Sequence, residues 1–186
     1  GVAPSSASPT PAAVPALSSS PKAAPTRVAS PTRSASATQA GTTVPVLGPN
    51  GIGALRLGMR RRQAEATGLI SPFQGTDGDG CALRAHLRAS AQADVLYSGS
   101  LGVEIIEAYA GVRTPEGIRI GSSLAAVRKA YPDWFNVTAG SEKEKYGDGR
   151  GLVVVPGNSK AHYRIVTVRG EVAELTLQYR NQNCYE

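Results

Sequence analysis

Two stretches of the chain begin with alternating apolar and polar residues and continue with helical spacing. The first, LRLGMRRRQAEATG, covers residues 55–68, and the second, IRIGSSLAAVRKAY, covers residues 118–131. In the second stretch Leu124, Val127 and Tyr131 recur at intervals that place them on one side of a helix. The pattern therefore predicts a short strand end and then a short helix at each place.

The two predicted helices differ in their first turns. The second has Ser122 or Ser123 as its N-cap, and Pro132 stops it. The first has Arg60 at the capping position, followed by two further arginines, and ends at Gly68. Because the helix dipole disfavours cations in the first turn, we expect groups outside the first helix, such as acids of a neighbouring loop, to compensate.

Strand-like alternation follows each predicted helix. The candidate strands are residues 81–88, 93–98 and 101–109 in the first half, and 151–157, 161–168 and 171–179 in the second half. The last two form a hairpin across Arg169 and Gly170. Alternation in the last strand predicts that Glu174, Thr176 and Gln178 face water while Ala173, Leu175, Leu177 and Tyr179 face the core.

The order of elements predicts an α+β fold. Helix, strands, helix and strands follow one another, and turns rather than crossovers join the strands, so the sheet is antiparallel. Residues 55–58 align with residues 118–121. We therefore expect two similar helix-plus-antiparallel-sheet units, roughly 52–112 and 113–186, within one domain. The alternative is coincidence, because a glycine before an amphipathic helix is common.

Composition separates residues 1–45 from the domain at 46–186. The first segment holds eight of the thirteen prolines, is otherwise mostly Ala, Ser and Thr, and has no aromatic or acidic residue. It cannot bury enough apolar surface to offset its ordering entropy, so we expect a disordered Pro/Ala/Ser-rich tether. Lys22, Arg27 and Arg33 supply half of the net charge of +6. The basic balance therefore predicts a tail near anionic membrane or cell-wall polymers rather than a nucleic-acid partner.

Cysteine usage and the tail both indicate an exported protein. No apolar run approaches the roughly 20 residues of a membrane-spanning helix. No signal peptide is present, but such a tail is typical of what remains after one is removed, so we expect a secreted or cell-envelope location. Cys81 and Cys184 form no CxxC motif, and one disulfide is the simplest account in an exported protein. The alternative is two buried thiols; we expect no metal and no cofactor.

The first helix start resembles a motif of two related groups of exported proteins. It is similar to the hydrophobic-x-x-Gly-Met start found in tandem in the β-lactamase inhibitor protein family and once in the outer-membrane assembly lipoproteins of the SmpA/OmlA (BamE-like) type. Gly58, Met59 and Ala64 match that motif. In the second copy Gly121 matches, and Ser122 replaces the methionine. The final hairpin, VTVRGEVAELTL, resembles the strands that close such units.

The resemblance implies a fold and a general role. Both groups pack a helix pair on an antiparallel sheet, are exported, and act by binding proteins, so it implies a non-enzymatic protein-binding module. The chain departs from the motif at Arg60, and each unit has one helix rather than a pair. No binding residue of the family can be carried over. The segment at 112–132, with NCYE at 183–186, also resembles secreted proteins or lipoproteins of actinobacteria whose function is unknown.

Candidate catalytic chemistry is sparse. A Ser/His/Asp hydrolase needs a histidine beside a nucleophile and an acid. His86 lies on the polar face of its strand between Arg84 and Arg88, and no acid adjoins it. His162 opens a strand. We therefore expect no catalytic residue, although a cell-envelope hydrolase with an unrecognised site remains the alternative function.

A partner surface is the expected functional feature. Arg84, His86 and Arg88 alternate onto one strand face and form a basic stripe. The irregular region at 132–151 adds Trp134, Phe135 and Tyr146, aromatic residues of the kind that anchor interfaces. The alternative places Trp134 and Phe135 in the core. The expected partner is another exported or envelope protein.

Overall fold

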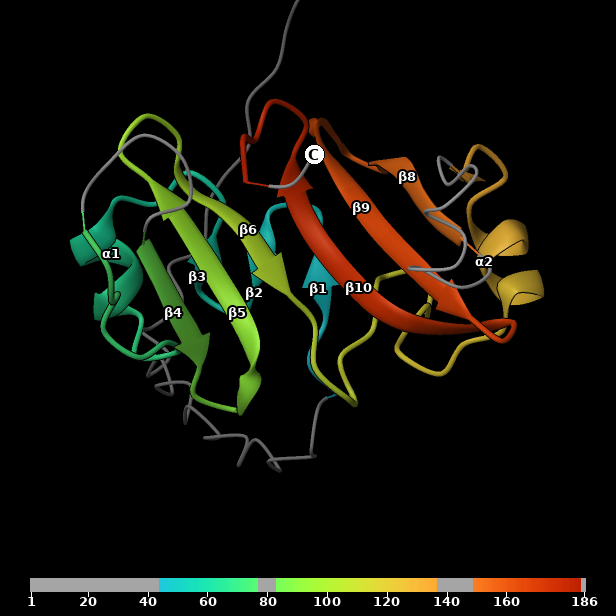
Figure 1. The fold of residues 1–186 in the computed structure, drawn as a ribbon, viewed down its shortest axis with the longest axis horizontal. Helices are drawn as coiled ribbons and strands as arrows, with labels where there is room; N and C mark the ends of the chain where they lie inside the picture. Colours follow the sequence, from blue (N-terminus) through green and yellow to red (C-terminus); the bar gives the residue numbers. More distant parts are fainter. Residues whose placement is uncertain (1–43, 77–82, 137–148, 185–186) are drawn as a thin grey trace, which may run out of the picture. The chain divides into compact units, whose positions relative to one another are not determined.

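Seven antiparallel strands form the main sheet of the described residues, in the order β4-β5-β6-β10-β9-β8-β7 (Figure 1). A computed structural model describes residues 44–76, 83–136 and 149–184. The strands are β4 (Leu83–Leu87), β5 (Ser90–Ser98), β6 (Gly102–Glu107), β7 (Phe135–Asn136), β8 (Gly149–Val155), β9 (Asn158–Val168) and β10 (Glu171–Tyr179). Strands β6 and β10, from the two halves of the chain, pair at the centre of the sheet.

Two helices and a small sheet complete the described elements. The helices are α1 (Arg61–Ala66) and α2 (Leu124–Ala130), and the small sheet joins β1 (Leu47–Gly48), β2 (Gly51–Ile52) and β3 (Leu55–Arg56). Neither helix is long and apolar enough to cross a membrane. Mixed helices and antiparallel sheet match the coarse α+β prediction, although strands dominate. The chain divides between Gln39 and Ala40 into two units, and the elements above belong to the second.

The helices and the small sheet pack against one face of the large sheet. Ala64 of α1, Val127 of α2 and Leu47 of β1 belong to a single core cluster with the inward side chains of the large sheet. Tyr163 of β9, fully buried, donates its hydroxyl to the Leu47 carbonyl at 2.8 Å. In Figure 1 the small sheet lies behind the large one. We call the opposite face of the large sheet the outer face.

The second helix forms as its sequence predicts. Ser123 is the N-cap, and its hydroxyl accepts the Ala126 N–H at 3.1 Å. Val127 and Tyr131 are buried. The Tyr131 hydroxyl lies 2.7 Å from Glu116 Oε2, which ties the end of the helix to the loop before it.

Among the described residues, backbone carbonyls accept hydrogen bonds from the arginines of the first helix. Arg60 donates from Nη1 to the Gly99 carbonyl at 3.0 Å, and Arg61 donates from Nη2 to the Phe73 carbonyl at 3.1 Å. Glu65 of the same helix adds a carboxylate, 3.3 Å from Arg61. Each of these two guanidinium groups therefore has a hydrogen-bond acceptor outside the helix.

The predicted hairpin is present, but the prediction of which side chains of its second strand face the core is wrong in part. Strands β9 and β10 meet at a turn in which Arg169 and Gly170 have φ angles of 54° and 79°. A β-bulge between Val172 and Glu174 shifts the phase of β10, so Ala173 is exposed. Thr176 and Gln178, which were expected to face water, are 2% and 4% exposed because β10 is central and large side chains of β6 and β9 flank both.

Matching hydrogen bonds join each helix start to a central strand. Before α1, the Gly58 N–H donates to the Val103 carbonyl at 2.7 Å, and the Val103 N–H donates to the Met59 carbonyl at 3.0 Å. Before α2, Gly121 and the residue after it make the same exchange with Val172, both bonds being 2.8 Å. The φ angles of Gly58 and Gly121 are 80° and 86°. Each start requires glycine because other residues rarely adopt this conformation.

Alanine at Gly102 should cost more stability than alanine at Gly121. Both positions have positive φ, so both substitutions carry strain of about 1–2 kcal/mol. At Gly102 a Cβ would also lie 2.7 Å from the Gly58 and Met59 carbonyl oxygens, whereas at Gly121 it would meet nothing within 4 Å. We expect an additional loss on the order of 2 kcal/mol for Gly102→Ala, measured by urea unfolding of both variants. Equal losses would contradict the close approach of the α1 start to β6.

Candidate functional site

Charged side chains of β4 and β5 pair across the outer face. Asp94 of β5 lies opposite His86. Its Oδ2 is 3.1 Å from Arg84 Nη1, and its Oδ1 is 2.7 Å from His86 Nδ1. The side chains of Arg84 and His86 are 60% and 49% exposed. The predicted basic stripe is therefore an ion-pair group that contains an acid.

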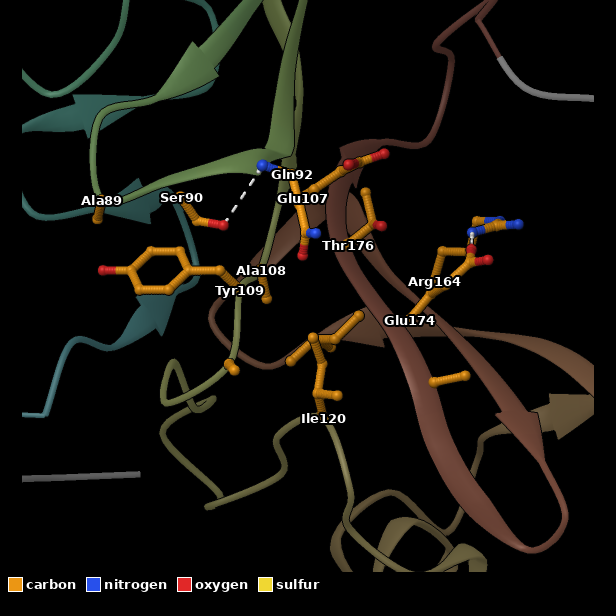
Figure 2. A pocket seen from close by; sticks show the side chains of 13 residues that line it. Ala89, Ser90, Gln92, Glu107, Ala108, Tyr109, Ile120, Arg164, Glu174 and Thr176 are labelled. Atoms are coloured by element: carbon orange, nitrogen blue, oxygen red, sulfur yellow. Dashed lines mark hydrogen bonds and ion pairs between the residues drawn. The ribbon is translucent and has the colours of Figure 1, made fainter.

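A polar groove lies further along the outer face, where β6 leaves β10. It has a volume of about 680 Å³. Its polar lining residues come from β5, β6, β9 and β10 and from the chain just after β6: Ser90, Gln92, Glu107, Tyr109, Arg164, Glu174 and Thr176. Figure 2 shows the Tyr109 ring on one side of this groove and the Arg164–Glu174 pair on the other.

A buried arginine forms one wall of the polar groove. Arg164 of β9 is 7% exposed, and its Nη1 lies 2.8 Å from Oε2 of Glu174, a side chain that is 54% exposed. A buried guanidinium needs a carboxylate and further acceptors to offset its desolvation. The contact with Glu174 supplies one such carboxylate and holds the two side chains together at the groove.

The pair formed by His86 and Asp94 has part of the geometry of a catalytic site. The Nδ1 contact with Asp94 orients the His86 imidazole, as an acid orients the base of a hydrolase. Among the described residues, no hydroxyl or thiol is hydrogen-bonded to that imidazole; Ser71 Oγ accepts only the backbone N–H of His86, at 3.0 Å. The arrangement therefore provides a base with an orienting acid and no positioned nucleophile.

Two ionisable groups of the large sheet, His162 and Glu104, have shifted pKa values. Burial, and secondarily the Arg180 charge, lower the pKa of His162 in β9. Burial raises the pKa of Glu104 in β6, although hydrogen bonds from the Ser98 side chain and the Asn183 backbone act in the opposite direction. Glu104 is completely buried. Neither group lines the polar groove, so both affect stability rather than chemistry there.

Stability should fall with rising pH because of Glu104. Its folded pKa is raised above the ordinary value of 4.5, so the folded state binds more protons than the unfolded state. Its contribution is therefore complete below that value and is lost as pH rises through the folded pKa. We expect Glu104→Gln to remove this part of the pH dependence, measured as the difference in unfolding free energy between variant and wild type from pH 4 to 8.

The control for this experiment is Glu171→Gln, since Glu171 is an exposed residue at the start of β10. The lowered pKa of His162 gives a pH dependence of the opposite sign, but His162 is present in every protein compared, so its contribution cancels in the difference. A Glu104→Gln profile parallel to that of the wild type would contradict the raised pKa.

The structure separates Arg88 and Trp134, two further predicted partner residues, from Arg84 and His86. Strand β4 ends at Leu87, so the alternation ends before Arg88, whose N–H donates to the Leu69 carbonyl at 2.8 Å. Trp134 is 7% exposed and belongs to the core cluster, which favours the core alternative because a buried ring offers a partner no surface. The side chain of Phe135 and all of Tyr146 lie outside the described residues.

The structure describes only one of the two cysteines of the predicted disulfide. Cys81 lies outside the described residues. Cys184 follows β10, and its Sγ is 3.0 Å from Glu104 Oε1 on β6. The pairing of the two cysteines stays a prediction.

Sequence reasoning missed the acidic groups of the outer face. Asp94, Glu107 and Glu174 are single acids in unremarkable strand contexts, and only the strand register brings them beside Arg84, His86 and Arg164. One available signal was the arginine within the apolar run AHYRIVTV, because a charge inside a central strand requires a partner. The described ranges contain no group of three or more His, Cys, Asp or Glu residues able to hold a metal ion.

Comparison with known proteins gives no match: no family model, no curated protein and no solved structure matches this chain.

Proposed function

We propose that this chain is an exported, envelope-associated protein-binding module without catalytic activity. Its docking surface is the outer face of the large sheet, including the polar groove. One observation carries the proposal: the helices and the small sheet pack on the inner face, while the described outer face presents charged groups held in fixed positions across strands. The resemblance to exported protein-binding families agrees with this role.

Charge distribution favours a protein partner over a nucleic acid. Acids lie between bases across the outer face: Asp94, Glu107 and Glu174 are on β5, β6 and β10, between Arg84 on β4 and Arg164 on β9. A phosphate backbone would meet carboxylates at several of these places, which would cost affinity. A protein surface with its own mixed charges can match such a pattern, and complementarity of this kind sets orientation and association rate.

We also propose that the domain consists of two copies of one unit, roughly residues 52–112 and 113–186. The matching hydrogen bonds at the two helix starts support this, as do the N-cap backbone angles: φ −70° and ψ 153° at Arg60, and φ −69° and ψ 151° at Ser123. In each unit a helix is followed by strands that end in a central strand of the sheet. Pairing β6 with β10 then gives one wide outer face from two small units.

Substitution on the outer face tests the binding proposal. We expect Arg84→Glu to reduce capture of envelope proteins by the immobilised chain, because it reverses the charge of an exposed side chain beside Asp94 on the outer face. Arg62→Glu is the matched control, since Arg62 is an exposed arginine of α1. Captured proteins are quantified by mass spectrometry, and equal capture by both variants and the wild type would count against the outer face.

The second candidate is a cell-envelope hydrolase, and the His86–Asp94 pair favours it. The proposal of a binding module predicts no release of soluble fragments from purified cell-wall polymer by the full chain. A release that His86→Ala abolishes and Arg62→Glu retains would establish the hydrolase instead.

A further inference from the structure

A second, apolar groove lies beside the polar one and is separated from it by Tyr109 and Ala89, which line both. It has a volume of about 480 Å³. Its walls come from the segment before β1, the end of β2, the chain after α1 and the turn after β4. We call it the apolar groove.

Aliphatic side chains form most of the apolar groove. Ile52 and Leu87 are buried at its base, at 6% and 3% exposure, while Val44 and Val46 are 48% and 38% exposed at its rim. Gly53 and Gly68 add no side chain to fill the space, and a Cβ at Gly68 would meet nothing within 4 Å. The groove therefore presents apolar surface to solvent, which favours an apolar occupant.

One cation stands in this lining. Arg88 is the only charged side chain among the described residues that line the apolar groove, and no carboxylate lines it. The hydrogen bond from its backbone N–H to the Leu69 carbonyl, at 2.8 Å, fixes the base of the side chain. Its guanidinium has no ion pair with the described acidic residues. The groove is thus electrostatically suited to an anion and unsuited to a cation.

We propose that the apolar groove binds one single-chain carboxylate amphiphile, a fatty acid, with its hydrocarbon chain along the aliphatic walls and its carboxylate on Arg88. Arginine binds carboxylates through two parallel hydrogen bonds. An extended peptide fits less well, because its backbone amides need partners when desolvated. Arg88 and Tyr109 are the only polar side chains of the described lining, whereas a hydrocarbon chain needs no polar partner.

Calorimetric titration of the full chain with dodecanoate, below its micelle concentration, tests the proposal. We expect one bound molecule per chain and much weaker binding of dodecyltrimethylammonium, which has the same chain and the opposite charge. Arg88→Gln should weaken dodecanoate binding about tenfold and should not weaken binding of the cationic amphiphile, because it removes a like charge. Arg88 is exposed, so this variant is expected to fold.

A matched pair of valine substitutions locates the site. Val46→Glu places a carboxylate on the groove rim and should abolish dodecanoate binding, whereas Val168→Glu, at 40% exposure in β9 and outside the groove, should not. Several results would overturn the proposal: no heat of binding, equal binding of both amphiphiles, binding unaffected by Arg88→Gln, or equal losses in the two valine variants. The proposal is independent of the binding role of the outer face.

Discussion

Replacing Trp134 with alanine is expected to lower the free energy of unfolding by about 3–5 kcal/mol. The ring is 7% exposed and packs in the core cluster that joins the helices to the large sheet. Its backbone N–H donates to the Tyr131 carbonyl at 2.9 Å, which holds the residue directly after α2. Truncation removes the ring's buried area and leaves a cavity that the surrounding sheet can only partly close.

A phenylalanine variant separates packing from polarity. The indole Nε1 is buried and has no hydrogen-bond partner among the described residues, so Trp134→Phe removes a polar group that is unsatisfied there while retaining an aromatic ring. We expect it to cost clearly less than Trp134→Ala in urea unfolding. If Trp134→Ala instead leaves stability nearly unchanged and weakens partner capture, Trp134 is an interface anchor and its placement in the core is wrong.

Loss of the proposed bond between Cys81 and Cys184 should have an effect of similar size. A bond closing a loop of roughly 100 residues restricts the unfolded chain by about 4–5 kcal/mol in the chain-entropy model, before any strain in the native state. We expect Cys184→Ser to lower the melting temperature by about 10 °C or more.

Intact mass before and after reduction measures the bond itself. Under denaturing, non-reducing conditions an alkylating reagent should modify neither cysteine, and after reduction it should modify both. Cys81→Ser and Cys184→Ser should destabilise equally, because either removes the same cross-link. Two alkylated cysteines in the non-reduced sample would exclude the bond.

The parts of the fold that depend on local sequence could be predicted, and those that depend on register could not. Ser123 caps α2 as its hydroxyl and position suggest, and the hairpin turns at Arg169 and Gly170. The bulge beside Ala173 has no local signal, and it reverses which side chains of β10 face inward near its start. Burial of Thr176 on the outer face follows from its central place in the sheet, which a single strand does not reveal.

In the candidate site, too, the features set by local sequence could be predicted and those set by strand register could not. Alternation places Arg84 and His86 on one face of β4, and β4 retains that alternation. Their acidic partner, Asp94, is on the next strand, and an irregularity in the β4–β5 register follows directly after His86, so spacing along the chain could not identify it. The polar groove exists because β6 separates from β10. This separation belongs to the tertiary structure, so the sequence pattern does not predict it.

Site-specific photo-crosslinking tests the proposed docking surface most directly. A photoreactive phenylalanine analogue is placed at Gln92 in the polar groove or at Arg62 on α1; both positions are exposed, so neither substitution should disturb folding. After irradiation in envelope extract, we expect the same discrete crosslinked protein band from repeated experiments with Gln92 and no such band from Arg62. Crosslinks at Arg62 alone, or at neither position, would contradict the proposal that the outer face binds a protein partner.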